Sequence, residues 1–330
     1  MNWASGYTYK IYGCEVDPKS WADRDRFNVK DGSVSKEADE LRQAADITVQ
    51  DYQPDREVWV RLYMDVEQSG DSTHQPLFTG LATSPSYDQD GVVQTTKMEC
   101  YSVLKPCDDV LLMRGWYASA YRDPVKIFKE LLEPCPAPVT FDEELPTLTS
   151  HLVAEDNESK LTMLDKVLKA LGLQLRIAGD GSIHIGRPST APVVTFSPNG
   201  FDIIEPELSV KNDWYSCPNV VMAIDDDLMA IARDNDEDSP LSIENRGREI
   251  WLADDSVDLN DGESLAEYAK RILKEEQSVV ETIEYKRAFI PDVEIGDTVR
   301  LRYEKFAGLY RVESQSFDLG GNVSEEVSKL

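Results

Sequence analysis

The sequence predicts an α+β fold that is mainly β, in which two β-rich lobes flank a small module of two helices and a hairpin. Apolar residues recur at helical spacing in two segments near the middle of the chain. A Gly-Asp-Gly turn follows them between alternating apolar residues, and strand-like alternation fills both flanks. The predicted domains are a first β lobe at residues 1–120, the module at 121–190, and a second β lobe with one helix at 191–330.

The second helix of the module and its hairpin are the most clearly marked elements. Apolar residues recur every three or four positions over residues 161–171, which places one apolar stripe along a helix. Ser159 can cap this helix and Gly172 can end it. Alternating apolar residues then lead into and out of a tight turn at residues 179–181, which predicts a hairpin.

Two further helices are predicted from their first residues. Asp123 is a candidate N-cap with Pro124 at the first helical position, and prolines at 134, 136 and 138 end this helix. A later helix has an apolar face over residues 265–273, with Asn260 or Asp261 as its cap.

Short runs of β-prone residues predict the strands of both lobes. In the first lobe they lie at residues 7–16, 27–29, 47–49, 58–64, 77–83, 92–102 and 110–117. Turns are expected at Asp31-Gly32 and Asp90-Gly91, residues 67–76 read as a polar loop, and residues 35–45 fit a short helix and a polar loop equally well. In the second lobe strands are expected at 193–196, 203–204, 208–210, 220–224, 229–232, 279–288, 297–303, 309–317 and 323–327, with turns at 225–227 and 320–322.

The charge of the chain limits its partners. It has 34 Lys and Arg against 62 Asp and Glu, a formal net charge of −28, and no segment concentrates the basic residues. Docking on nucleic acid phosphates is not expected, because that affinity comes from cations that displace counterions. A surface that must not hold DNA remains compatible with this charge.

No segment predicts membrane insertion or a disulfide framework. The first six residues have no basic segment before an apolar run, and no window approaches the length of a membrane span, so we expect a soluble chain made in the cytoplasm. The cysteines are odd in number and form no C-x-x-C pair, which predicts buried or incidental thiols. They are Cys14, Cys100, Cys107, Cys135 and Cys217.

The sequence contains no recognisable catalytic, cofactor or metal motif, and we expect no such site. His74 in the predicted polar loop, His151 before the second helix and His184 within the hairpin are each expected to be exposed or packed side chains. Aspartates at 234, 236 and 238 resemble the start of a calcium loop, but Ser239 replaces its glycine and Asn245 its final glutamate, which favours a solvated hairpin tip.

An internal echo suggests that the two lobes are versions of one structure. In the first lobe Val60-Arg61-Leu62-Tyr63 is followed by Phe78-Thr79-Gly80-Leu81 and a turn at Gly91. In the second, Val299-Arg300-Leu301-Arg302-Tyr303 is followed by Phe306-Ala307-Gly308-Leu309 and a turn at Gly320. A chance match remains an equal alternative for so short a repeat.

The order of these pieces carries a family resemblance. The segments concerned are Val60-Arg61-Leu62-Tyr63, Phe78-Thr79-Gly80, Glu99-Cys100-Tyr101-Ser102-Val103-Leu104, Asp123-Pro124, residues 161–171, Gly179-Asp180-Gly181 and residues 290–299. Over nearly its whole length the chain resembles the baseplate or tail-tip hub proteins of tailed bacteriophages and contractile injection systems, in their T4-like and Mu-like forms. It departs from their pattern at Arg56-Glu57, where the family often has Gly-Asp.

The resemblance implies a structural virion protein at the tail tip or baseplate, and not an enzyme. It implies a homotrimer in which each chain contributes two tail-tube-like β-barrels, so that a pseudo-sixfold ring joins a sixfold tail tube to a threefold spike or fibre. The implied partners are further copies of the chain, the tail tube or distal tail protein, the tape measure protein, and the spike or fibre. DNA would pass through the ring, and acidic residues facing the lumen would repel it. Because the sequence ends after the last predicted strand, wall-degrading activity is expected in another protein.

Two other functions fit the composition. A carbohydrate-binding or carbohydrate-active β protein could use paired carboxylates or an aromatic platform, although the six tryptophans are scattered along the chain. A calcium-stabilised adhesion module could use Asp234, Asp236 and Asp238, and a chelator would then lower its melting temperature.

Overall fold

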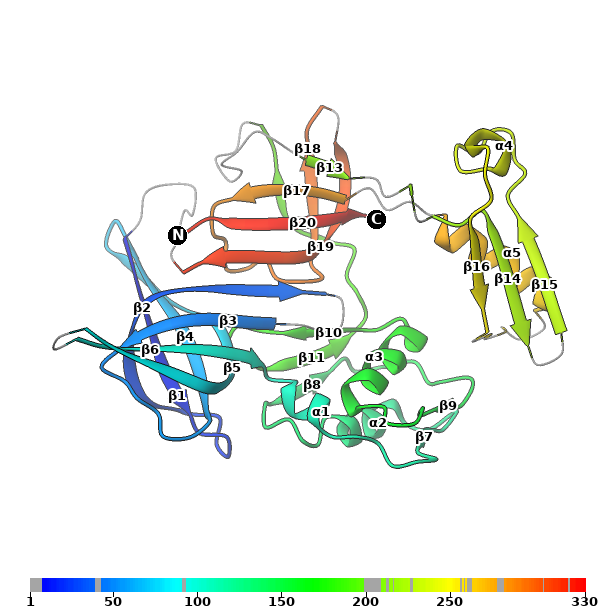
Figure 1. Cartoon of the computed structure of the whole chain (residues 1–330). Coiled ribbons are helices and arrows are strands. Elements are labelled where there is room, and N and C mark those ends of the chain that lie inside the picture. Colours follow the sequence, from blue (N-terminus) through cyan, green and yellow to red (C-terminus); the bar gives the residue numbers. More distant parts are fainter. Residues whose placement is uncertain are drawn as a thin grey trace. The chain divides into compact units, whose positions relative to one another are not determined.

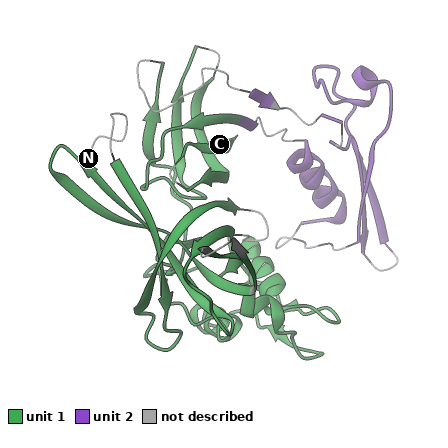
Figure 2. Cartoon of the chain, turned by 60° about the vertical axis from the view of Figure 1, so that its left-hand side comes forward, with its two compact units in different colours: residues 1–208, 284–330 green, residues 209–283 purple. Residues whose placement is uncertain are grey.

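The fold is mainly β, as the sequence predicts (Figure 1). The computed structural model describes residues 8–38, 43–90, 93–198, 209–211, 214–215, 217–225, 228–255, 257, 259, 263–277, 282–304, 306–319 and 321–330. The chain divides into two compact units, residues 1–208 with 284–330 and residues 209–283 (Figure 2). The finer predicted boundaries at residues 120 and 190 stay a prediction. Among the described residues no helix is long and apolar enough to cross a membrane.

Six antiparallel strands form the first lobe. They are β1 (Thr8–Val16), β2 (Asp23–Glu37), β3 (Gln43–Gln50), β4 (Val58–Gln68), β5 (Asp71–Asp90) and β6 (Val93–Ser102). Their order is β1-β4-β5-β6-β3-β2, and β1 also pairs with β2, so the pairing returns to the strand where it began. Alternate residues of these strands, including Val60, Leu62, Phe78 and Met98, form one buried core.

Two expected interruptions of the first lobe are absent. Residues 71–76 of the predicted polar loop lie in β5, because Ser69 and Gly70 adopt positive φ angles of 52° and 91° and form a tight turn directly after β4. Asp31 and Gly32 are not a turn either. They lie inside β2, which pairs with β3 along most of its length. A β-bulge between Val29 and Asp31 shifts the register of this pairing.

The helix considered for residues 35–45 is also wrong. Ser35 pairs with Ala44 and Val34 with Ala45 across β2 and β3, because both strands alternate buried and exposed residues in a shared register. Residues 39–42 lie outside the described residues, as do residues 1–7 and Gly91.

The second half of β2 continues the sheet into the C-terminal strands. These are β12 (Pro192–Phe196), β17 (Thr282–Arg287), β18 (Thr298–Arg302), β19 (Ala307–Asp318) and β20 (Val323–Lys329). The first half of β19 pairs with β18, and after a bulge between Val312 and Ser314 its second half pairs with β2. β20 and β17 follow on the far side of β19. The echoed segments are therefore antiparallel neighbours in both places, β4 with β5 and β18 with β19.

The module packs its helices and a small sheet around a separate core. Its elements are α1 (Lys105–Asp109), β7 (Tyr117–Ala118), α2 (Pro124–Leu131), β8 (Val139–Phe141), β9 (Leu152–Val153), α3 (Lys160–Leu171), β10 (Gln174–Ile177) and β11 (Ile183–Gly186). Both predicted caps are confirmed: Asp123 accepts a hydrogen bond from the backbone of Val125, and Ser159 from that of Thr162. Gly172 ends α3 at a φ of 60°.

The strand predicted at residues 110–117 is mostly wrong. Only Tyr117 belongs to a strand, and Leu111 forms an isolated bridge with Ser159. The backbone of this segment forms hydrogen bonds with the loop before α3, where Leu112 donates to the carbonyl of Glu158. This loop is too short to act as a partner strand in a sheet.

The five cysteines are free thiols. Cys14, Cys100 and Cys107 are buried, while Cys135 and Cys217 are partly exposed. Burial raises the pKa of the Cys107 thiol to about 12 and that of Cys135 to about 11, so both thiols stay protonated and unreactive at neutral pH.

The tip of the module hairpin docks on the first lobe. Arg61 of β4 is 5% exposed and donates through Nη2 to the carbonyl of Asp180 at 2.9 Å and through Nε to the hydroxyl of Thr79 at 3.0 Å. Thr79 in turn donates to the carbonyl of Gly179 at 2.8 Å. These hydrogen bonds hold the hairpin tip of the module against the first lobe. Arg61 and Thr79 both belong to the first pair of echoed segments.

The second unit is a three-stranded sheet with a helix on one face. Its elements are β13 (Ser209–Lys211), β14 (Val220–Asp225), β15 (Leu228–Arg233), α4 (Ile243–Arg246), β16 (Trp251–Asp254) and α5 (Leu265–Glu276), and the sheet order is β15-β14-β16. The predicted pair of strands around residues 225–227 is confirmed. The cap of α5 is Ser264, which forms a capping box with Glu267; Asn260 and Asp261, predicted as caps, lie outside the described residues, as do residues 203–204 and 320.

Replacing Gly179 by alanine should destabilise the chain, because the new Cβ would lie 2.0 Å from the backbone oxygen of Pro76. We expect a loss of about 1–3 kcal/mol in the free energy of unfolding, the usual cost of overpacking. Chemical denaturation would measure it. Gly321→Ala, whose Cβ would meet nothing closer than 3.5 Å, is the matched control and should be nearly neutral. Equal effects of the two changes would contradict the docking of the hairpin tip.

Candidate functional site

One face of the sheet runs without interruption from the first lobe into the C-terminal strands. Its side chains alternate with buried core residues along β6, β3, β2, β19 and β20, and all are exposed or partly exposed. We call this surface the acidic face. It consists of Asp31, Ser33, Ser35, Glu37, Ala44, Asp46, Thr48, Lys97, Glu99, Tyr101, Ser314, Ser316, Asp318, Ser324 and Glu326.

Strand register arranges the acidic face in rows. One row places Glu99, Asp46, Ser33 and Asp318 next to each other across four strands. The row beside it holds small side chains in its centre, with Ser35 opposite both Ala44 and Ser316. The face is therefore smooth at its middle and negatively charged beside it.

Few positive charges balance the carboxylates of the acidic face. Of its residues six are Asp or Glu and one is a cation, Lys97, which forms an ion pair with Asp88 at 3.1 Å. Asp46 and Glu99 lie directly opposite each other on β3 and β6. Like charges in that position destabilise a sheet, so these carboxylates reduce the stability of the chain.

A groove of about 650 Å³ opens on the acidic face. Asp31, Asp46, Glu99 and Asp318 contribute to its lining, together with Lys97. The groove is a polar surface feature and not an enclosed pocket, and it suits contact with a large, hydrated object better than recognition of a small molecule.

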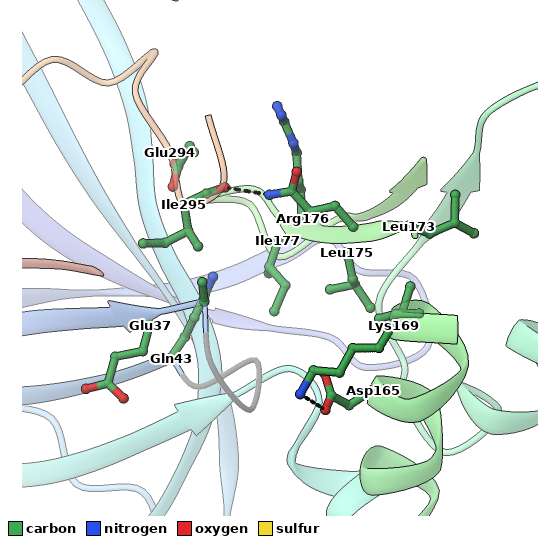
Figure 3. Close-up of a pocket in the computed structure, with 13 residues that line it drawn as sticks. Glu37, Gln43, Asp165, Lys169, Leu173, Leu175, Arg176, Ile177, Glu294 and Ile295 are labelled. Atoms are coloured by element: carbon green, nitrogen blue, oxygen red, sulfur yellow. Dashed lines mark hydrogen bonds and ion pairs between the residues drawn. The ribbon is translucent and has the colours of Figure 1, made fainter. Parts of the chain in front are cut away.

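A second cavity, of about 180 Å³, lies beside α3 and β10 (Figure 3). Leu175 and Ile177 contribute to its apolar lining. Asp165 and Lys169 at its rim form an ion pair at 2.8 Å. Since its lining is mainly apolar and the charged pair at its rim is already satisfied, we do not treat this cavity as the functional site.

The residues that resemble a calcium loop form a hydrogen-bonded turn. Asp234 is 8% exposed, and its carboxylate accepts hydrogen bonds from the backbone of Asp236, the hydroxyl of Ser239 and the amide of Gln277. The Asp236 carboxylate accepts from the backbone of Asp238. Within the described ranges no group of His, Cys, Asp and Glu is placed to hold a metal ion.

The three histidines lie apart from the acidic face. His74 is in β5 and not in a loop, and its Nδ1 is 2.6 Å from Asp65. His151 accepts a hydrogen bond from the backbone of Ala120. His184 lies in β11 as predicted, between Thr140 and Asp142, at 3.0 and 3.1 Å. Thr140, Asp142 and His184 line neither of the cavities described above. Their hydrogen bonds join β8, and the residue that follows it, to β11.

Aromatic residues likewise form no sugar-binding platform on the acidic face. Trp21, Trp59 and Trp116 pack against the module core. The stacked rings of Tyr12 and Tyr63, 5.4 Å apart, are 5% and 8% exposed and offer little surface to a ligand.

Comparison with known proteins places the fold. No protein-family model matches the chain, and no curated protein matches its sequence. Solved structures do match. A 43 kDa tail protein of prophage MuSo2 from Shewanella oneidensis is 14% identical with a TM-score of 0.66, over 98% of this chain and 97% of that one. A tail protein from Neisseria meningitidis MC58 is 16% identical with a TM-score of 0.65, over 99% and 97%.

This chain has the fold of phage tail proteins. A third match, an Escherichia coli protein described as a component of the type VI secretion system, is 10% identical with a TM-score of 0.53, over 92% of this chain and 74% of that one. At such identities the shared feature is the tail-protein fold, and function must be argued from the residues of this chain.

Residues 290–299, which contribute to the family resemblance, form a junction in this tail-protein fold. Glu294 forms an ion pair with Lys36 of β2 at 2.5 Å, and Lys36 is 3% exposed. Asp297 forms an ion pair with Arg176 of the module at 2.6 Å, and burial raises the pKa of its carboxyl. The segment thereby connects the last strands to both the first lobe and the module.

The sequence predicts an acidic surface only through the family resemblance, and it assigns none of the residues of the acidic face to that surface. The alternation that marks this face is visible in β2, where Ser33, Ser35 and Glu37 alternate with the buried residues Val34 and Lys36. The sequence alone does not reveal this face, because residues 35–45 also fit a short helix or a polar loop, and because the neighbour of these residues, β19, is almost 300 positions away in the chain.

Removing one charge from the acidic face should stabilise the chain. We expect Asp46→Asn to raise the free energy of unfolding by about 0.2–1 kcal/mol, because it relieves the repulsion by Glu99. The gain should shrink in 1 M salt, where the Debye length is about 3 Å. Urea denaturation at two salt concentrations would measure it, with Asp88→Asn as a control that removes an attractive pair instead. A loss of stability in Asp46→Asn would contradict this account of the face.

Proposed function

We propose that the chain is a structural virion protein of a phage tail tip or baseplate hub and that it is not an enzyme. Three copies would form a ring that adapts the sixfold tail tube to a threefold spike or fibre. The partners would be the tail tube or distal tail protein, the tape measure protein, and the spike or fibre. The observation that carries the proposal is the acidic face, which continues across both lobes of a chain with the tail-protein fold.

In this proposal each lobe is a tail-tube-like barrel. The circuit of β1-β4-β5-β6-β3-β2, with β1 also paired to β2, supports this for the first lobe. Two lobes in each of three chains would give six barrel-like segments around one axis. The antiparallel pairing of both echoed segments is consistent with a common origin of the lobes.

The acidic face would line the central channel. DNA phosphates approaching Asp46, Glu99 and Asp318 would be repelled, and the small side chains around Ser35 would leave the wall smooth. A repelling wall allows a genome to slide without binding. This gives a functional reason for like-charged residues that reduce stability.

The trimer predicts a defined mass in solution. Light scattering after size exclusion should find a species of three 37.2 kDa chains at high concentration, and negative stain should show a ring with a central hole. A chain that stays monomeric at every concentration, alone and with its tail partners, would contradict the homotrimer.

The channel can be tested by reversing its charge. A variant with Asp46, Glu99, Asp318 and Glu326 changed to lysine should retain linear double-stranded DNA, because cations in a narrow channel bind phosphates. It should retain a covalently closed circle of equal length far less, since a closed circle cannot thread a ring. Gel shift and filter binding would measure both.

A matched control places the same four charges elsewhere. Asp55, Glu133, Glu155 and Asp156 have side chains that are 76–88% exposed, and none belongs to the acidic face. The variant with these four residues changed to lysine should bind linear and circular DNA equally. If the first variant also shows no preference for linear DNA, the acidic face does not line a channel.

A further inference from the structure

The sheet of the second unit has one face closed by a helix. α5 packs on β14 and β15, and Figure 1 shows it against that side of the strands. Val221, Ala223 and Ala232 of the sheet are buried beneath it with Tyr268 and Ala269 of the helix. The helix therefore covers the centre of this face.

The opposite face exposes large apolar side chains. Strand register places Met222 beside Ile231 and Ile224 beside Met229, and it places Trp251 on the same side of β16. Met229 is 61% exposed, Ile231 44% and Trp251 46%. We call these five residues the apolar face of the second unit.

Such a surface is unusual on a soluble protein. Single exposed apolar residues need no explanation, but a contiguous group across three strands marks a docking site. One end of the group is polar: the guanidinium of Arg233 lies 5.0 Å from the ring centre of Trp251 and pairs with Glu249. Large, flexible methionine side chains beside a tryptophan are typical of a surface that adapts to a partner.

The structure indicates what shape would fit. On its other face the same three-stranded sheet takes an amphipathic helix of 12 residues, α5. A second helix on the exposed face would complete a three-layer arrangement, a common way to bury both sides of a small sheet.

Charge indicates the chemistry of that helix. Residues 209–283 contain 7 Lys and Arg against 19 Asp and Glu, so a docking partner gains from basic flanks. A second copy of this chain is a poor match, since it carries the same acidic excess of 62 against 34. The occupant is therefore better sought in another protein.

We propose that the apolar face binds an amphipathic helix of another protein, with an apolar stripe flanked by Lys and Arg. The proposal rests on the second unit alone, and it holds whether or not three chains form a ring. It adds a helix-docking site to the surfaces that a hub needs for its barrels and channel.

A designed peptide can serve as the probe. We would use a leucine–lysine peptide of about 18 residues, five helical turns, with leucines spaced three and four apart. The full chain should bind it saturably in isothermal titration calorimetry. The corresponding leucine–glutamate peptide should bind at least about tenfold more weakly, because its charge opposes that of the unit.

Two variants on one strand separate apolar docking from simple charge attraction. Ile231→Asp changes the apolar face, whereas Leu228→Asp adds the same charge at a residue that is 65% exposed and alternates to the other side of β15. Ile231→Asp should weaken binding of the leucine–lysine peptide about tenfold or more, as expected for loss of an interface anchor, and Leu228→Asp should leave it unchanged. Met229→Asp, at a more exposed position, should reproduce the loss. Circular dichroism melts would check that all three variants fold.

Three results would overturn the proposal. Equal binding by the Ile231 and Leu228 variants would show attraction by net charge alone. Absence of any saturable binding would show that the face does not accept a basic helix. If Ile231→Asp instead lowers the mass of the chain in light scattering while peptide binding persists, a second copy occupies the face. If the chain forms no trimer, the peptide result is unaffected, so the two proposals can be tested independently.

Discussion

The structure of the first unit depends on the pairing of β2 with β19. A strand edge without a partner exposes a row of backbone donors and acceptors, and this pairing satisfies them for residues 33–37. It also aligns the alternation of the two strands. The buried side chains Val34 and Phe317 join one core, and the exposed side chains form one continuous face.

Two buried ion pairs secure this arrangement, and their residues Lys36 and Glu325 both lie opposite Gln315 of β19. Arg287 and Glu325 are 1% and 2% exposed and form an ion pair at 2.5 Å, to which Gln315 adds a hydrogen bond to the same carboxylate. Lys36 and Glu294 form a second ion pair between β2 and the loop before β18. Buried pairs contribute little net stability, but removing one partner is costly, so they favour a single register over its alternatives.

The two units distribute their exposed side chains differently. The first unit presents a charged, smooth face with little apolar surface, which suits an object that must pass without binding. The second presents an apolar face within a strongly acidic sequence, which suits a partner that must bind. Both features come from the same alternation of side chains along a strand, and they differ only in which residues occupy the outward positions.

Local patterns in the sequence predicted much of the module. The caps Asp123 and Ser159, the end of α3 at Gly172 and the hairpin around Gly179 all depend on neighbours within a few residues. The same holds for α5 and for the pairing of β14 with β15. The predictions failed where a long strand contains residues typical of turns, as at Asp31, or where its core contacts end before the strand does, as at the start of β5.

By itself the sequence determined the mainly β character, the helices α2 and α3 with their caps, and the acidic charge, because these follow from composition and short-range spacing. Only the tertiary structure decided that Arg61 holds the hairpin tip, that β2 meets β19, and which acidic residues share one face. Each of these depends on residues from about 20 to almost 300 positions apart. Backbone pairing and burial bring such residues together, and neither leaves a periodic signal within one segment.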